Sequence, residues 1–90
     1  MTLESKVEIN ENVFIQEVDD ETILLDSETQ EYFSLNEIGT LFYYFLQEYE
    51  TLQKVLDELK KSFDVDEAQL KEDLFDFVKA LEEQNLLKVL

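Results

Sequence analysis

The stretch Glu31-Tyr32-Phe33-Ser34-Leu35-Asn36-Glu37-Ile38-Gly39 contains the point at which the chain changes from strand to helix. Tyr32 and Phe33 favour a strand, whereas Asn36 is a good helix N-cap and Glu37 suits the positive end of the helix dipole. The repeat of apolar residues therefore changes near Leu35 from every two residues, typical of a strand, to every 3.6 residues, typical of a helix. We predict a strand before this point and a helix after it.

Three strand-like segments precede the helical part. Residues 13–18 and 22–26 are short and rich in β-branched and apolar residues, and the polar residues 19–21 between them have the length of a hairpin loop. A second polar turn at residues 27–30 leads into residues 31–35. These segments predict a three-stranded antiparallel meander, which is too small to be stable without other elements packed against it.

Apolar residues at helical spacing predict three helices after Asn36. The first spans about residues 37–49, and its apolar face leaves out Tyr43 and Tyr44, which we expect either at an interface or on the surface. The second begins at Thr51 and ends near Phe63. The three apolar stripes comprise Ile38, Leu41, Phe42, Phe45, Leu46 and Tyr49; Leu52, Val55, Leu56, Leu59 and Phe63; and Leu70, Leu74, Phe77, Val78 and Leu81.

The third helix carries signals at both ends. Asp66-x-x-Gln69 resembles a capping box, and Asn85 suits a left-handed C-cap before a last short strand. The predicted fold is therefore α+β and winged-helix-like, with a three-stranded antiparallel meander followed by three helices. We assign residues 13–90 to a single domain and residues 1–12 to a frayed N-terminal arm with one edge strand at Val7–Ile9.

The composition excludes most catalytic chemistry. The 90 residues include no Cys and no His, which removes thiolate and imidazole nucleophiles and the usual zinc sites. Among 23 acidic residues, close carboxylate pairs such as Glu72-Asp73 arise by chance, and nothing marks an apolar pocket for a general acid. We expect no catalytic residue, no metal and no cofactor. With no signal peptide or membrane-length apolar run, we also expect a cytoplasmic protein.

The formal charge of −16 narrows the choice of partners. Residues 1–35 carry ten acids and one lysine, so this surface repels phosphate and anionic lipid and attracts basic groups, although it can also serve only for solubility. The second and third helices look like a helix-turn-helix, but residues 66–85 contain seven acids and two lysines. We therefore expect neither nucleic acid nor membrane as a partner.

Two local features suggest other kinds of site. Asp26-Ser27 could carry phosphopantetheine in a small acidic carrier, although a carrier serine begins a helix and Ser27 lies in a polar turn. Phe75 lies off the apolar stripe of the third helix, between Lys71 and Lys79, and is either a contact residue or ordinary core. The alternative function is accordingly a small acidic carrier or a protein-protein interaction or inhibitor module.

Residues 28–39, Glu-Thr-Gln-Glu-Tyr-Phe-Ser-Leu-Asn-Glu-Ile-Gly, resemble the D-x-x-T-G-x-Y-Y-x-L-N-x-T-G signature of the PqqD-like family. Members of this family recognise the leader peptides of ribosomally synthesised, post-translationally modified peptides. The resemblance extends over about residues 13–88. Differences from the family pattern are Gln30 for the turn glycine, Ile38 for Thr, Phe42 for Trp and Asn85 for a late glycine.

The resemblance implies binding rather than catalysis. The leader of a precursor peptide is expected to add as a strand to the third strand, in the groove beside the third helix. As a stand-alone adaptor, the chain would deliver the leader to a separate modifying enzyme, which in similar families is a radical-SAM protein, a leader peptidase or a cyclodehydratase. The implied peptide-binding residues are Glu31, Tyr32, Phe33 and Ser34 on the strand and Lys71, Phe75 and Val78 on the helix.

Overall fold

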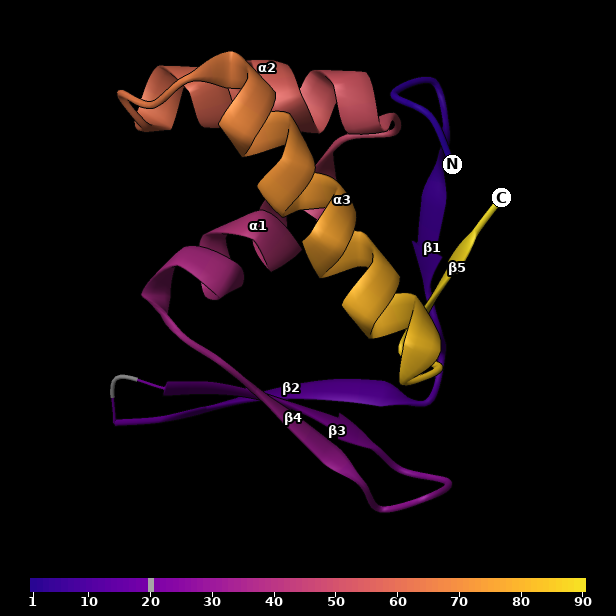
Figure 1. The fold of residues 1–90 in the computed structure, drawn as a ribbon. Helices are drawn as coiled ribbons and strands as arrows, with labels where there is room; N and C mark the ends of the chain where they lie inside the picture. Colours follow the sequence, from indigo (N-terminus) through magenta and orange to yellow (C-terminus); the bar gives the residue numbers. More distant parts are fainter. Residues whose placement is uncertain (20) are drawn as a thin grey trace.

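The computed structural model describes residues 1–19 and 21–90. A three-stranded sheet lies below three helices, and two short strands pair at one side (Figure 1). The elements in chain order are β1 (Val7–Ile9), β2 (Val13–Val18), β3 (Glu21–Asp26), β4 (Tyr32–Leu35), α1 (Glu37–Glu48), α2 (Leu52–Ser62), α3 (Glu67–Glu83) and β5 (Leu87–Val89). The predicted α+β architecture, a meander followed by three helices, is confirmed.

The meander has the order β2-β3-β4, and both pairs are antiparallel. Val18 lies opposite Glu21 in the first pair, and Leu25 lies opposite Tyr32 in the second. In the predicted loop 19–21, Glu21 already belongs to β3, and Asp20 lies outside the described residues. Because side chains alternate along each strand, Leu24 and Leu35 point to the buried face of this sheet.

The N-terminal arm is docked, which corrects the expectation that it is frayed. β1 pairs with β5, with Val7 opposite Val89. The arm also provides hydrogen-bond acceptors for the free N–H groups in the first turn of α2. The Ser5 carbonyl oxygen accepts a hydrogen bond from the Leu52 N–H, and the Leu3 carbonyl oxygen accepts one from the Gln53 N–H. These partners lie far along the chain, so local sequence did not indicate the docking.

The helix termini follow the cap chemistry in most places. Asn36 Oδ1 accepts a hydrogen bond from the Gly39 N–H at 2.7 Å, and Thr51 Oγ1 accepts one from the Lys54 N–H at 3.3 Å, as predicted. Asn85 is left-handed with φ 59°, also as predicted. Asp66 makes no side-chain cap bond, and the Gln69 amide instead donates to Asp73 one helical turn later. The predicted capping box is therefore wrong.

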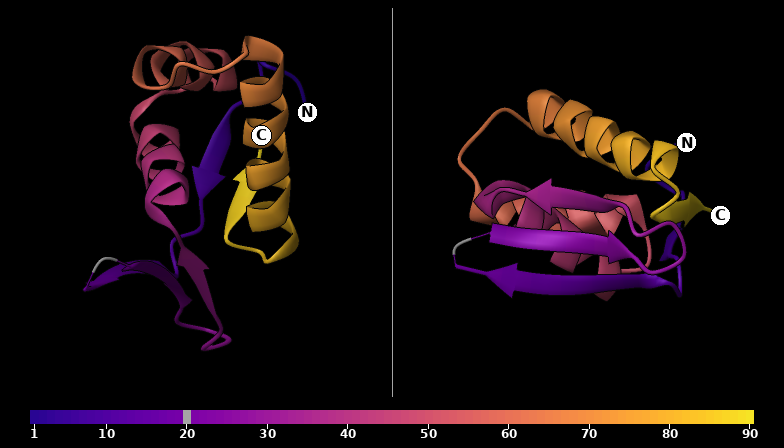
Figure 2. Two further views of the ribbon diagram at one scale, coloured as in Figure 1. Left: turned by 60° about the vertical axis from the view of Figure 1, so that its left-hand side comes forward. Right: turned by 90° about the horizontal axis from the view of Figure 1, so that it is seen from below.

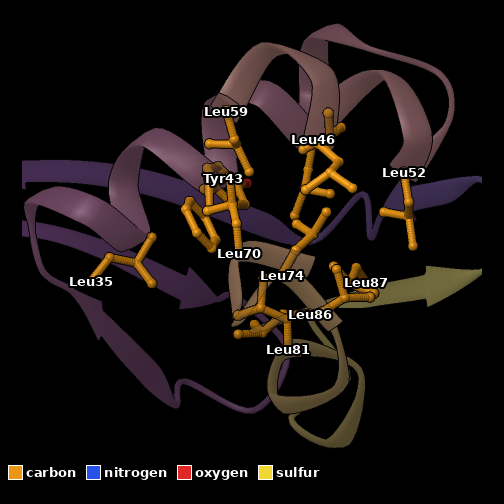
Figure 3. Packing of buried hydrophobic residues seen from close by; sticks show 14 of the residues in the cluster. Leu35, Tyr43, Leu46, Leu52, Leu59, Leu70, Leu74, Leu81, Leu86 and Leu87 are labelled. Atoms are coloured by element: carbon orange, nitrogen blue, oxygen red, sulfur yellow. The ribbon is translucent and has the colours of Figure 1, made fainter. Parts of the chain in front are cut away.

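The core lies between α1, α2 and α3 and extends to the sheet and β5, as Figure 3 shows. It includes every residue of the predicted stripes except Ile38 and Leu41 of α1, and it also contains Tyr43, which the predicted stripe left out. Tyr43 is buried, 2% exposed, because α1 packs against the sheet on one side and against α2 on another, so more than one face is covered. Ile38 is 53% exposed because it lies in the first turn of α1, at the edge of the core.

Candidate functional site

The turn between β3 and β4 is held by the buried carboxylate of Asp26. Asp26 Oδ1 accepts hydrogen bonds from the Glu28 N–H at 2.9 Å, the Asn12 side-chain amide at 2.6 Å and the Thr29 N–H at 3.3 Å. The Glu28 bond has the largest effect and lowers the pKa of Asp26, although burial acts in the opposite direction. Gln30 completes the turn in the left-handed region, with φ 63°. The start of β4 is thus fixed.

The outer edge of β4 is unpaired, because β3 is its only neighbour in the sheet among the described residues. The Glu31 carbonyl accepts a hydrogen bond from the Asp26 N–H at 2.9 Å. In an antiparallel ladder, successive residues face the neighbouring strand alternately. The N–H and C=O groups of Phe33 therefore point toward β3, whereas those of Tyr32 and Ser34 point to the open side.

One rim of α3 borders this open edge. Figure 2 shows that β4 is the strand of the meander nearest to α3. Gln84, just after α3, lines a small hollow with Tyr32 and Phe33. Farther along, the position that a Cβ would take on Gly39 lies 3.4 Å from Cε1 of Phe77 and 3.5 Å from Cδ2 of Leu35, so the Phe77 ring lies near the end of β4. Phe77 and Gln84 thus define the groove between β4 and α3.

An apolar hollow of about 100 Å³ lies at the α1 end of this groove. Phe42 forms its floor and packs edge-to-face with Phe63 and Phe77, with ring centroids 6.4 and 5.5 Å apart. Ile38 and Val65, both 53% exposed, stand at the mouth. Asp73 of α3 contributes a carboxylate to the lining. The hollow can accept one apolar side chain and places a negative charge beside it.

The helix residues implied by the family resemblance do not line this groove. Lys71 and Phe75 lie at a separate hollow that they share with Leu3 and Gln53, and Lys71 Nζ is 5.7 Å from the centre of the Phe75 ring. Val78 is fully buried in the core. The strand residues implied by the same resemblance, 31–34, do border the open edge. The structure therefore shifts the helix side of the candidate site toward Phe77.

Sequence reasoning placed Phe77 in the apolar stripe and missed its position at the groove. One signal was present: counting 100° per residue, Phe77 lies on the flank of the stripe centred near Leu81, on the side opposite Phe75. Which flank faces β4 depends on how α3 crosses the sheet, and that is a tertiary feature.

Two other kinds of feature are absent from residues 1–19 and 21–90. These residues form no group of three acidic side chains arranged to hold a metal ion. In the same part of the chain, no helix is long and apolar enough to cross a membrane.

A small α+β domain with an open strand edge beside a helix defines a class of peptide-recognition domains. Residues 21–87 match the family of coenzyme PQQ synthesis protein D (PqqD), and the chain belongs to this family. Comparison with curated proteins gives no match.

Two solved structures are similar over nearly the whole chain. One shows TbiB1 in complex with the TbiA(beta) leader peptide, at 31% identity and a TM-score of 0.82, covering 90% of this chain and 94% of that one. The other is lasso peptide synthetase B1 complexed with the leader peptide, at 20% identity and a TM-score of 0.84, covering 92% of this chain and 98% of that one. The second similarity bears on the fold alone.

Proposed function

We propose that this chain binds the leader segment of a ribosomally made precursor peptide by strand addition to β4. The observation that carries the proposal is the open edge of β4 beside the Phe77 rim of α3, where Tyr32 and Ser34 direct backbone groups outward. Main-chain pairing gives affinity to such a complex, and side-chain pockets give selectivity. Membership of the PqqD family and the similarity to TbiB1, solved with a leader peptide, support the same function.

β2 is the other edge of the sheet and is a poorer site for strand addition. Glu17 lies on its helix-facing side, opposite the buried Thr22, and accepts a hydrogen bond from the Tyr44 hydroxyl. An inward-pointing charge on an edge strand disfavours pairing with another strand. β4 carries no such charge, because its helix-facing residues are Phe33 and Leu35.

The apolar hollow at Ile38 and Phe42 indicates which side chains the bound peptide carries. We expect it to receive an aliphatic or aromatic side chain of the leader, since its walls are apolar and partly exposed. Asp73 in the lining and Glu31 at the other end of the groove favour Lys or Arg nearby in the peptide.

The proposed role is binding without turnover. Asp26 is the one buried acid in the described part of the chain, and its hydrogen bonds are used to hold a turn. Ser27 lies in that same turn and not at the start of a helix, which speaks against the carrier alternative. The chain would then deliver the leader to a separate modifying enzyme, whether a radical-SAM protein, a leader peptidase or a cyclodehydratase.

Substitution of Ser34 tests the proposal with a control at the same position. Ser34→Pro removes the outward N–H, whereas Ser34→Ala keeps it, and the side chain is exposed in either case. Calorimetry with leader peptides taken from neighbouring open reading frames should show one-to-one binding of one leader to wild type and to Ser34→Ala. We expect at least tenfold weaker binding to Ser34→Pro.

Amide hydrogen exchange gives an independent readout. On binding the leader, the amides of Tyr32 and Ser34 should exchange more slowly, while Phe33, already bonded to β3, should change little. Protection confined to α2, or equal affinity of Ser34→Pro and Ser34→Ala, would contradict strand addition to β4.

A further inference from the structure

The face of the β2-β3-β4 sheet that points away from the helices is apolar and open. The register places Phe14, Leu25 and Tyr32 in one row across the three strands, and alternation adds Ile23 and Val18 on the same side. Phe14 is 57% exposed, Val18 51% and Tyr32 71%. We call this surface the outer face; its eight residues are Phe14, Gln16, Val18, Glu21, Ile23, Leu25, Tyr32 and Ser34.

Nothing in the described chain covers the outer face. All three helices lie on the other side of the sheet (Figures 1 and 2), and the view from below shows the strands unobstructed. Exposed apolar residues scattered singly are ordinary on protein surfaces, but a contiguous group of them marks an interaction site. Here the apolar residues are neighbours across the strands.

Charge indicates what kind of partner fits this face. In a chain of net charge −16, the outer face carries one acid, Glu21, while the exposed acids Glu11, Asp19 and Glu28 lie just beyond the ends of its strands. An apolar centre depleted of charge inside a polar rim is the usual anatomy of a protein interface. A second copy of this chain would present the same acidic rim and be repelled, and anionic lipid would be repelled for the same reason.

We infer that the outer face is the docking surface for the modifying enzyme, through an apolar patch on that enzyme ringed by Lys and Arg. This inference rests on the proposed function for the identity of the partner. The two sites are continuous at Tyr32, whose backbone faces the open edge of β4 while its side chain lies on the outer face. A peptide paired with β4 would add every second side chain to the same face. The enzyme would then contact the adaptor and the leader together.

Two substitutions on β2, away from the leader groove, test the inference. Phe14→Thr and Val18→Thr remove apolar surface but keep strand propensity, and because both residues are more than half exposed we expect little loss of stability. Leu90→Thr is the control, because Leu90 is 67% exposed at the opposite end of the chain. The probe is the purified modifying enzyme encoded with the precursor, and its binding to immobilised full-length chain is measured by interferometry.

We expect each of Phe14→Thr and Val18→Thr to weaken enzyme binding about tenfold or more, as for residues central to an interface. Leu90→Thr should match wild type, and added salt should weaken wild-type binding because the rim contacts are electrostatic. Leader affinity should be unchanged in all three variants. Leader affinity therefore distinguishes the two proposals. A wild-type chain that does not bind the leader would refute the proposed function, whereas the enzyme-binding measurement tests the outer face.

Three results would overturn the inference. The first is enzyme binding that is equal in wild type and in the double Phe14→Thr, Val18→Thr variant. The second is a wild-type dimer in analytical ultracentrifugation that this double variant dissociates, because a second copy would then occupy the outer face. The third is binding to phosphatidylcholine vesicles that depends on Phe14, which would make the face a lipid contact.

Discussion

Phe77 and Phe75 offer a matched pair of perturbations on α3. Both rings are half-buried, but Phe77 lies at the β4 groove and Phe75 at the hollow beside Leu3. Truncating a fully buried Phe costs about 3–5 kcal/mol, so we expect about 2–3 kcal/mol for either Phe→Ala change. Phe77→Ala loses an edge-to-face contact with Phe42, and Phe75→Ala loses a cation–π contact with Lys71. Each contact contributes a similar free energy, about 0.5–1 kcal/mol.

Leader affinity should separate the two variants. Phe77→Ala removes a wall of the proposed groove and should weaken leader binding by about 1.5–3 kcal/mol, which is roughly ten- to 150-fold. Phe75→Ala should bind the leader within about twofold of wild type, since a change away from the binding site leaves the Kd nearly unaltered. Urea unfolding measures stability, and calorimetry at a temperature where both variants are folded measures affinity.

The opposite result, in which Phe75→Ala weakens leader binding and Phe77→Ala does not, would place the peptide on the other rim of α3 and refute the proposed groove. A domain of this length has roughly 5–15 kcal/mol of stability, so both variants should remain folded. If Phe77→Ala is too unstable, Phe77→Leu keeps part of the packing and should show a smaller loss of affinity in the same direction.

Three further predictions concern the supports of β4 and α1. Asn36→Ala should lower the free energy of unfolding by about 1 kcal/mol in urea titrations, because the Gly39 N–H loses its partner. Gln30→Gly should raise the melting temperature, since a left-handed conformation costs a non-glycine residue about 1 kcal/mol; an unchanged or lower value would contradict this. Because the pKa of Asp26 is lowered in the folded state, its carboxylate stabilises the fold above about pH 4, and this contribution is lost as pH falls through the folded-state pKa. Asp26→Asn should therefore lose less stability than wild type on acidification from pH 5 to pH 2, followed by circular dichroism.

The strand-to-helix change at Asn36 was predictable because its determinants are local. The N-cap, the first-turn acid and the apolar spacing lie within a few residues, and the structure has the cap bond to Gly39. The same reasoning found the meander and the left-handed Asn85. The open edge of β4 was also predictable, because β4 is the last strand of the meander, whereas the residues that bind a peptide there stay a prediction.

Tertiary packing explains what the sequence did not indicate. Tyr43 is buried because two neighbours cover different sides of α1, which no single apolar stripe records. The side of α3 that faces β4 depends on its crossing angle, so the sequence favoured Phe75, which lies off the apolar stripe, and assigned Phe77 to the core. Asp66 failed as a cap because a favourable residue type does not guarantee the geometry, and Gln69 had a nearer partner in Asp73.

The pairing of β1 with β5 has a consequence for how the chain folds. These strands are separated by almost the entire sequence, so bringing them together is the least local step in forming the structure. During synthesis on the ribosome, β1 has no partner until residues 87–89 have emerged, whereas the strands of the meander emerge much earlier. We therefore expect the edge of β4 to form in the nascent chain before Leu86 and Leu87 complete the core.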